Sequence, residues 1–277
     1  MTEVASWSSQ TPSRRYMARH QKRGTRGNII KSIAELIKNA DDTYDRAGST
    51  SGKIEIGFWK LKKTQRRAIG GFYVRDWGQG MTKDIAIQAY KKYGEDTTAG
   101  ARNAAIGVGG KDALLGMNDC RILTVCDASP LVIQVRTDPV HNDLESRILE
   151  GEEALRCFRE FDSKTSPPAR PLKASESGTV VAFRIPETVH CPRFDTVAQE
   201  LTQYYTLRTI MEDPQRTVEL LDVDTGKRTR LHHSPPEGVI KGKHSLEIPY
   251  RGTMYRVSVE FKRAATALDK DKELGYA

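Results

Sequence analysis

Apolar residues between Asn28 and Arg46 recur with the spacing of one helix face and predict the clearest helix of the chain. The pattern stops near Gly48, and glycine commonly follows the last turn of a helix. The apolar positions of this helix are Ile29, Ile30, Ile33, Leu36, Ile37 and Ala40.

Shorter apolar blocks predict several strands around this helix. The main strands are expected at residues 53–59, 71–75, 121–125, 131–135 and 179–185. A turn at Ser129–Pro130 would join the third strand to the fourth. Two more helices are expected, at residues 82–93 and 194–211. Most of the expected elements are therefore strands.

Three segments lack such periodicity. Residues 1–12 are rich in Ser and Thr, and we expect them to be disordered or only lightly docked. Residues 94–103 are small and polar, which favours a mobile loop. Residues 137–176 carry charges and prolines with little pattern, so we expect a long insertion outside the core.

Beyond Pro214 the pattern changes to hairpins, the first of them around a turn at Asp224–Thr225–Gly226. The strands expected in this part are 218–223, 229–232, 245–250 and 254–261. This change predicts a domain boundary near residue 212, with a second domain that we expect to be incomplete. The expected units are a basic arm at 1–27, a main domain at 28–211 and a β-rich domain at 212–277.

The chain carries a formal net charge of +8, and much of it lies in the first thirty residues. Such an arm can contact a polyanion such as DNA or RNA, or can be a solvated tail. Charge carries no sequence specificity, so both interpretations stay open. The basic residues of the arm are Arg14, Arg15, Arg19, Lys22, Arg23 and Arg26.

No stretch approaches the roughly 18 apolar residues of a membrane span, and the N-terminus lacks the apolar core of a secretory signal. The cysteines form no CxxC pair, which argues against a zinc site or a disulfide framework. We therefore expect no membrane contact and a cytoplasmic location, or a nuclear one in a eukaryote. The four cysteines are Cys120, Cys126, Cys157 and Cys191.

Three polar residues of the first helix share one face. Glu35, Asn39 and Asp42 stand at i, i+4 and i+7, which places them within about 60° of one another around the helix axis. Such a face is often simply solvated. However, an amide oxygen can bind magnesium and a carboxylate one turn away can act as a base towards water.

A second polar cluster, Asp76-Trp77-Gly78-Gln79-Gly80-Met81, follows a predicted strand directly. A carboxylate at a strand end can accept a hydrogen bond from an adenine amino group, and glycines let the backbone approach a flat ring. Asp-x-Gly is also common turn chemistry. Gly178-Thr179 opens a later strand, where a plain strand start is the alternative.

A glycine loop at residues 106–112 opens a short helix, so free backbone N–H groups and the positive end of the helix dipole favour a phosphate. A P-loop would need glycine at Ala105 and Ser or Thr at Asp112. A dinucleotide fingerprint that starts at Gly107 would need glycine at Asp112. The loop therefore fits neither of these two motifs.

Taken in order, these four clusters resemble the signature of GHKL ATPases, the family of gyrase B, the chaperone Hsp-ninety, MutL, MORC and sensor histidine kinases. The match covers about residues 26–190. It implies an α+β fold of the Bergerat type, a two-layer α/β sandwich in which helices cover one face of a mixed sheet. The β-rich segment would be the start of a transducer-like domain.

The resemblance implies ATP and Mg²⁺ as ligands and a role for each matched residue. Glu35 would be the general base, Asn39 the magnesium ligand and Asp42 a helper near it. Residues 94–105 would form a lid over ATP. The residues expected at adenine are Asp76, Gly78, Gly80, Met81 and Thr179. Those expected along the phosphates are Gly107, Gly109, Gly110 and Lys111.

The paired Glu35 and Asn39 resemble the hydrolysing branches of the family more than the histidine kinases. The resemblance thus implies an ATPase that acts as a nucleotide-gated switch and forms a homodimer on binding ATP, with a protein client or nucleic acid as further partners. The alternative is a sensor or scaffold that binds nucleotide without hydrolysis. Asp112 departs from the pattern, because many relatives have glycine there.

Overall fold

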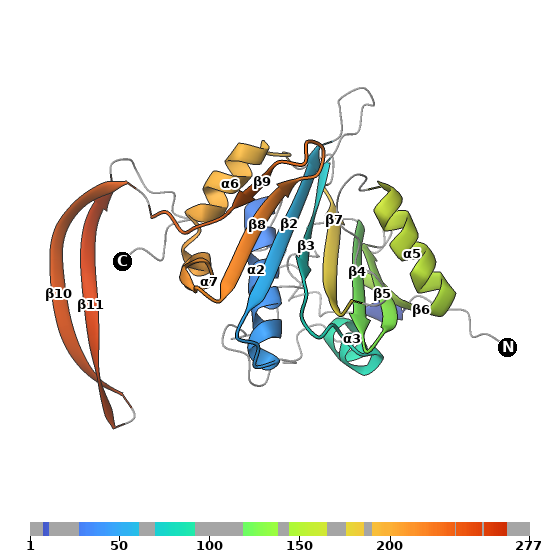
Figure 1. The fold of residues 1–277 in the computed structure, drawn as a ribbon, viewed down its shortest axis with the longest axis horizontal. Helices are drawn as coiled ribbons and strands as arrows, with labels where there is room; N and C mark the ends of the chain where they lie inside the picture. The colour runs from blue at the N-terminus through green and yellow to red at the C-terminus, as the bar shows by residue number, and fades with distance from the viewer. Residues whose placement is uncertain are drawn as a thin grey trace.

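A computed structural model describes residues 8–10, 28–60, 70–91, 119–137, 144–164, 176–185, 190–235, 237–250 and 252–264. In these ranges the chain forms a mixed α/β fold around a sheet of nine strands, and a separate sheet of two strands (Figure 1). The pairing of β2 with β8 is parallel, and the other described pairings are antiparallel.

The nine-stranded sheet has the order β1-β6-β5-β4-β7-β3-β2-β8-β9. The strands predicted between residues 53 and 185 are confirmed, each with one or two residues added or shifted at its ends. In sheet order the strands are β1 (Ser8–Gln10), β6 (Leu144–Glu150), β5 (Ser129–Thr137), β4 (Asp119–Cys126), β7 (Gly178–Arg184), β3 (Gly70–Asp76), β2 (Gly52–Lys60), β8 (Arg216–Asp222) and β9 (Arg228–Arg230).

The predicted first helix is confirmed as α2 (Ile29–Arg46), with Asn28 as its N-cap. It packs on β2 and β3, and its isoleucines form one core together with α6 (Phe194–Thr202), η1 (Tyr205–Leu207) and α7 (Arg208–Glu212). The helix predicted at 194–211 is therefore three short helical pieces. The helix predicted at 82–93 is α3 (Lys83–Lys91). Among the described helices, none is long and apolar enough to cross a membrane.

Helix α5 (Gly151–Lys164) packs on the other face of the sheet, so the described helices cover both faces and not one (Figure 1). The prediction that residues 137–176 form an insertion outside the core was wrong, since β6 is a strand of the nine-stranded sheet and α5 packs on that sheet. Within residues 151–159 of α5, whose side chains the structure describes, the buried residues are Ala154, Cys157 and Phe158. This narrow stripe is hard to recognise among charged neighbours.

The turn between β4 and β5 lies at Asp127–Ala128, and the prediction of Ser129–Pro130 was wrong. Both turn residues have positive φ, 49° and 58°, as a two-residue hairpin turn of type I′ requires. Pro130 sits at the start of β5 opposite Val125. A proline is tolerated near the start of a strand, which explains why it did not mark the turn.

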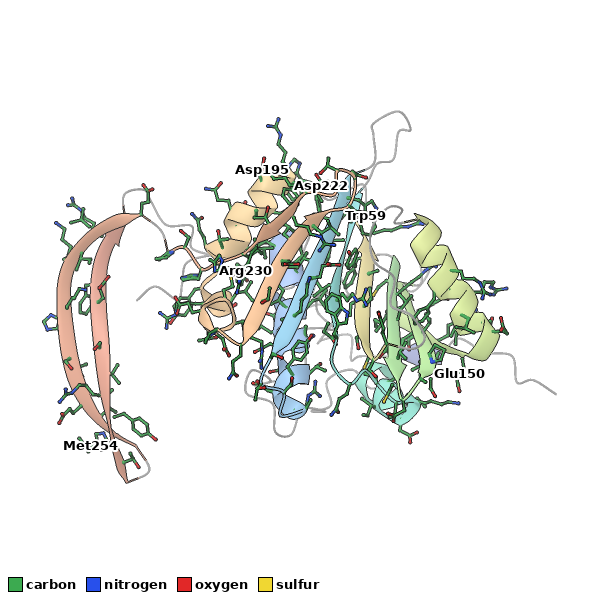
Figure 2. The ribbon with its side chains drawn as sticks, viewed as in Figure 1. Trp59, Glu150, Asp195, Asp222, Arg230 and Met254 are labelled. Atoms are coloured by element: carbon green, nitrogen blue, oxygen red, sulfur yellow. The ribbon has the colours of Figure 1, made fainter. Side chains whose placement is uncertain are left out.

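Strands β8 and β9, which the sequence places after the expected boundary near residue 212, belong to the nine-stranded sheet. The rest of the β-rich segment is a hairpin of β10 (Gly238–Tyr250) and β11 (Thr253–Ala264). One face of this hairpin carries the ion pairs of Lys243 with Glu260 and Arg256 with Glu247. Figure 2 shows Met254 near its tip, and this side chain is 60% exposed.

Candidate functional site

Asp76 is the last residue of β3 and is buried, with 5% of its surface exposed. Its Oδ1 atom accepts a hydrogen bond of 2.9 Å from the backbone N–H of Gly78. The sheet register places it directly opposite Thr179 on β7. The register therefore brings together two residues that the sequence separates by more than a hundred positions.

Burial raises the pKa of the Asp76 carboxyl to about 7. Hydrogen bonds from the backbone N–H groups of Gly78 and Thr179 act in the opposite direction, as do the more distant charges of Arg75 and Arg46. These groups do not offset the loss of water around the carboxylate. A buried carboxyl that titrates near neutral pH is a common feature of binding sites and active sites.

The loop after β3 follows a path that needs glycine. A Cβ atom on Gly78 would lie 2.4 Å from Cγ2 of Thr43, so this loop packs tightly against α2. Gly80 has a φ of +73°, and a Cβ atom there would lie 2.0 Å from the carbonyl oxygen of Val125. The two glycines that the sequence assigned to adenine thus fix the loop between α2 and the end of β4.

Thr124 of β4 holds the end of this loop and was missed by the sequence analysis. Its Oγ1 atom accepts a 2.8 Å hydrogen bond from the backbone N–H of Met81 and donates one of 3.1 Å to the carbonyl of Gly178. The same atom lies 3.1 Å from Oγ1 of Thr179. The available signal was a hydroxyl at a core-facing position of an apolar strand, two residues after Ile122.

The polar face of α2 is divided in the structure. Asp42 is buried, whereas Asn39 is exposed. Glu35 is half-buried, and one of its carboxylate oxygens accepts a 2.7 Å ion-paired hydrogen bond from Nζ of Lys38. Burial, and to a smaller extent the charge of Glu35, raise the pKa of the Tyr204 phenol to about 12.

The structure describes the residues expected at adenine but not those expected along the phosphates. Asp76, Gly78, Gly80, Met81 and Thr179 are brought together at the ends of β3, β4 and β7. Outside the described residues lie the lid at 94–105 and the phosphate-loop residues Gly107, Gly109, Gly110 and Lys111. No group of three or more His, Cys, Asp or Glu side chains in the described ranges could hold a metal ion.

A buried ion-pair cluster joins the C-terminal half of α2 to β8. Arg216, the first residue of β8, donates from Nε to Oδ1 of Asp41 at 2.6 Å and from Nη2 to Oδ1 of Asp45 at 2.7 Å. Only 3% of the Arg216 side chain is exposed. This cluster fastens the C-terminal half of α2 to β8.

Searches against models of protein families and against curated proteins find no match to this chain.

Proposed function

We propose that this chain is an ATP-binding domain of the GHKL type that binds adenine at Asp76. The observation that carries the proposal is the buried Asp76 carboxyl, placed at a strand end among Gly78, Gly80 and Thr179. The sheet and the helices on its α2 face support a Bergerat fold of two layers. Helix α5 is then an addition on the other face.

The chemistry of Asp76 supports recognition of adenine. A carboxylate has about four acceptor positions, and the backbone N–H groups of Gly78 and Thr179 fill only part of this capacity. An amino group such as the one at C6 of adenine would supply a further donor. Guanine carries a carbonyl oxygen at that position, and two acceptors facing each other in a buried site would be repulsive.

We further propose that the bound ATP is hydrolysed. Glu35 would accept the proton of the attacking water. Asp42, two turns further along the same helix, would be a helper. Mg²⁺, when bound, would neutralise phosphate charge and take the Asn39 amide oxygen as its protein ligand. A single protein ligand fits magnesium, which usually keeps several waters and binds phosphate oxygens as well. The segment with Gly107, Gly109, Gly110 and Lys111 would follow the phosphates.

Adenine binding at Asp76 is tested by calorimetric titration of wild type and Asp76→Asn with ATP and with GTP. We expect the substitution to weaken ATP binding at least about tenfold, because the new amide group would face the adenine amino group donor to donor. The same amide can donate to guanine, so the preference for ATP over GTP should shrink. The control is Glu55→Gln, because Glu55 is a buried carboxylate on the other face of the sheet. This variant should bind ATP as wild type does. Equal ATP affinity of Asp76→Asn and wild type would remove the proposal.

A second candidate is a nucleotide sensor that binds ATP without hydrolysis. The ion pair of Glu35 with Lys38 favours it, because the ammonium group of Lys38 occupies a carboxylate oxygen that would have to contact the attacking water. Magnesium-dependent phosphate release by wild type, Glu35→Ala and Lys38→Ala separates the two. Hydrolysis that is lost only in Glu35→Ala supports the ATPase. Absence of turnover in all three proteins, with ATP binding intact, supports the sensor.

The wider activity that we propose is that of a nucleotide-gated switch, in which ATP closes the lid at 94–105 and promotes a homodimer. The segment after residue 212 would transmit this change as a transducer-like region. A protein client, or nucleic acid bound by the basic arm at 1–27, would be the further partner. A cytoplasmic or nuclear location, with no membrane contact, fits this activity.

A further inference from the structure

Tyr44 lies beneath the loop that carries Asp76 and is not among the residues that the proposed function uses. Its hydroxyl accepts a 2.7 Å hydrogen bond from the backbone N–H of Trp77 and donates one of 2.5 Å to the carbonyl of Lys53. Tyr44 is on α2, Lys53 is on β2, and Trp77 follows β3. One phenol oxygen therefore joins three elements next to the candidate base site.

The position of the phenol is tightly constrained. Tyr44 is 3% exposed, and its ring fills the space where a Cβ atom on Gly52 would lie 2.5 Å from Cδ2. The guanidinium of Arg216 lies over the ring, 5.4 Å from its centre. Burial raises the pKa of Tyr44 to about 12, so the hydroxyl keeps its proton and both hydrogen bonds at neutral pH.

The bonded N–H belongs to the residue between Asp76 and Gly78. Gly78 in turn donates its backbone N–H to the Asp76 carboxylate, so a shift of the Trp77 backbone would move this donor. The Trp77 ring is held separately, with the Arg75 guanidinium 4.2 Å from its centre and the Lys53 ammonium at 5.5 Å. The tyrosine thus fixes the backbone of Trp77, while the cations hold its side chain.

We propose that Tyr44 is a positioning residue that sets the backbone of the base-binding loop through its hydroxyl group. The inference rests on the proposed function for its effect on nucleotide affinity, but not for its effect on the loop. Removal of the hydroxyl leaves the Trp77 N–H without its acceptor and frees the loop to shift away from the geometry that Asp76 needs.

The experiment compares Tyr44→Phe with Tyr73→Phe. Tyr73 is a matched control, because it is equally buried and donates its hydroxyl to Glu55 at 2.9 Å, but on the opposite face of the sheet. Hydrogen exchange of the Trp77 amide is measured first, without nucleotide. We expect faster exchange at Trp77 in Tyr44→Phe and wild-type exchange in Tyr73→Phe.

Calorimetric titration with ATP is the second measurement. We expect Tyr44→Phe to lose about three- to tenfold in affinity, the equivalent of one hydrogen bond, and Tyr73→Phe to bind as wild type does. Thermal unfolding checks that both variants are folded and are destabilised to a similar extent. A general loss of stability would lower both affinities alike and would overturn the positioning role.

The outcomes separate this inference from the proposed function. Wild-type protein that binds no ATP contradicts the proposed function, and the exchange of the Trp77 amide still tests the role of Tyr44. Wild-type protein that binds ATP, together with unchanged exchange and affinity in Tyr44→Phe, overturns the positioning role alone. Faster exchange with unchanged affinity supports the effect of the hydroxyl on the loop and overturns its effect on nucleotide binding.

Discussion

Two buried carboxyl groups on neighbouring strands, Asp76 of β3 and Glu55 of β2, have opposite surroundings. Glu55 faces away from α2, where Oε1 accepts from the Tyr73 hydroxyl at 2.9 Å and Oε2 pairs with Arg228 at 2.6 Å. Asp76 faces α2, and its nearest donors are backbone N–H groups. Glu55 has a counter-charge in direct contact, whereas the donors in contact with Asp76 that the described part of the chain supplies are neutral.

The comparison indicates what each carboxyl can do. Glu55 belongs to a network of ion pairs, because Arg228 also lies 3.5 Å from Glu219 and Glu219 pairs with Lys53 at 2.7 Å. A network that satisfies its own members stabilises one arrangement of the sheet. Among the described residues Asp76 has no ion partner in contact, which costs stability and leaves acceptor capacity for a ligand. Burial alone therefore does not distinguish a structural carboxylate from a binding one.

The largest expected effect on stability comes from Glu55→Ala. The substitution leaves the Tyr73 hydroxyl buried without its acceptor and removes the partner of Arg228, so we expect the free energy of unfolding to fall by about 3 kcal/mol. Urea denaturation measures this loss. Nucleotide affinity, measured on the folded variant, should stay at the wild-type value. A drop in affinity as large as that of Asp76→Asn would show that the two carboxyls serve one site.

A smaller effect is expected from pH. The pKa of Asp76 is raised to about 7 in the folded protein, above the value of about 4 in an unfolded chain. The folded state therefore holds more protons than the unfolded state between these values, and its stability is lost as the pH rises through this window. One such proton contributes at most about 1.4 kcal/mol per pH unit.

Urea denaturation of wild type and Asp76→Asn at pH 5, 6, 7 and 8 measures how much the Asp76 proton contributes to the free energy of unfolding. We expect wild type to lose about 2 kcal/mol relative to Asp76→Asn between pH 5 and 7, and little more above pH 7. Glu55→Gln keeps Asp76 and should follow the wild-type slope near neutral pH. A constant difference between wild type and Asp76→Asn would show that Asp76 titrates as it does in the unfolded chain.

The sequence predicted those parts of the fold and site that depend on local pattern. The apolar period gave α2, whereas the expectation that Thr179 lies beside Asp76 came from the family resemblance, and the sheet register places these two residues opposite each other. Helix α5 was missed, because buried residues such as Ala154, Cys157 and Phe158 stand among charged ones and produce no clear period. Because the helix itself was not predicted, its packing on the second face of the sheet could not be predicted either.

Tyr44 and Arg216 were missed in the sequence for the same physical reason. Tyr44 lies on the same helix face as Ile33, Ile37 and Ala40, so its position is typical of plain packing. Its role depends on Trp77, which is 33 residues away, and the contact of Arg216 with Asp41 spans 175 residues. Such contacts are set by the sheet register, in particular by the parallel pairing of β2 with β8. Local periodicity does not report this register.

The smallest expected effect comes from Thr124→Val, which tests whether Thr124 supports Asp76 by holding the end of the loop after β3. Valine keeps the shape of threonine but removes the acceptor of the Met81 N–H and the contact with Thr179. We expect a loss of about 1–2 kcal/mol in the free energy of unfolding, because the hydrogen bonds with Met81 and Gly178 are both lost. We also expect a fall in ATP affinity that is smaller than for Asp76→Asn, because the Asp76 carboxyl itself remains.

Thr217→Val on β8 is the control for Thr124→Val, since it makes the same change in another strand of the sheet. It should leave ATP affinity unchanged. The double variant Thr124→Val with Asp76→Asn measures whether the two residues are coupled. If Thr124 acts by holding the loop at Asp76, its effect on affinity should largely disappear once Asp76 is replaced. Additive losses would mean that Thr124 contributes to affinity without acting through the carboxyl.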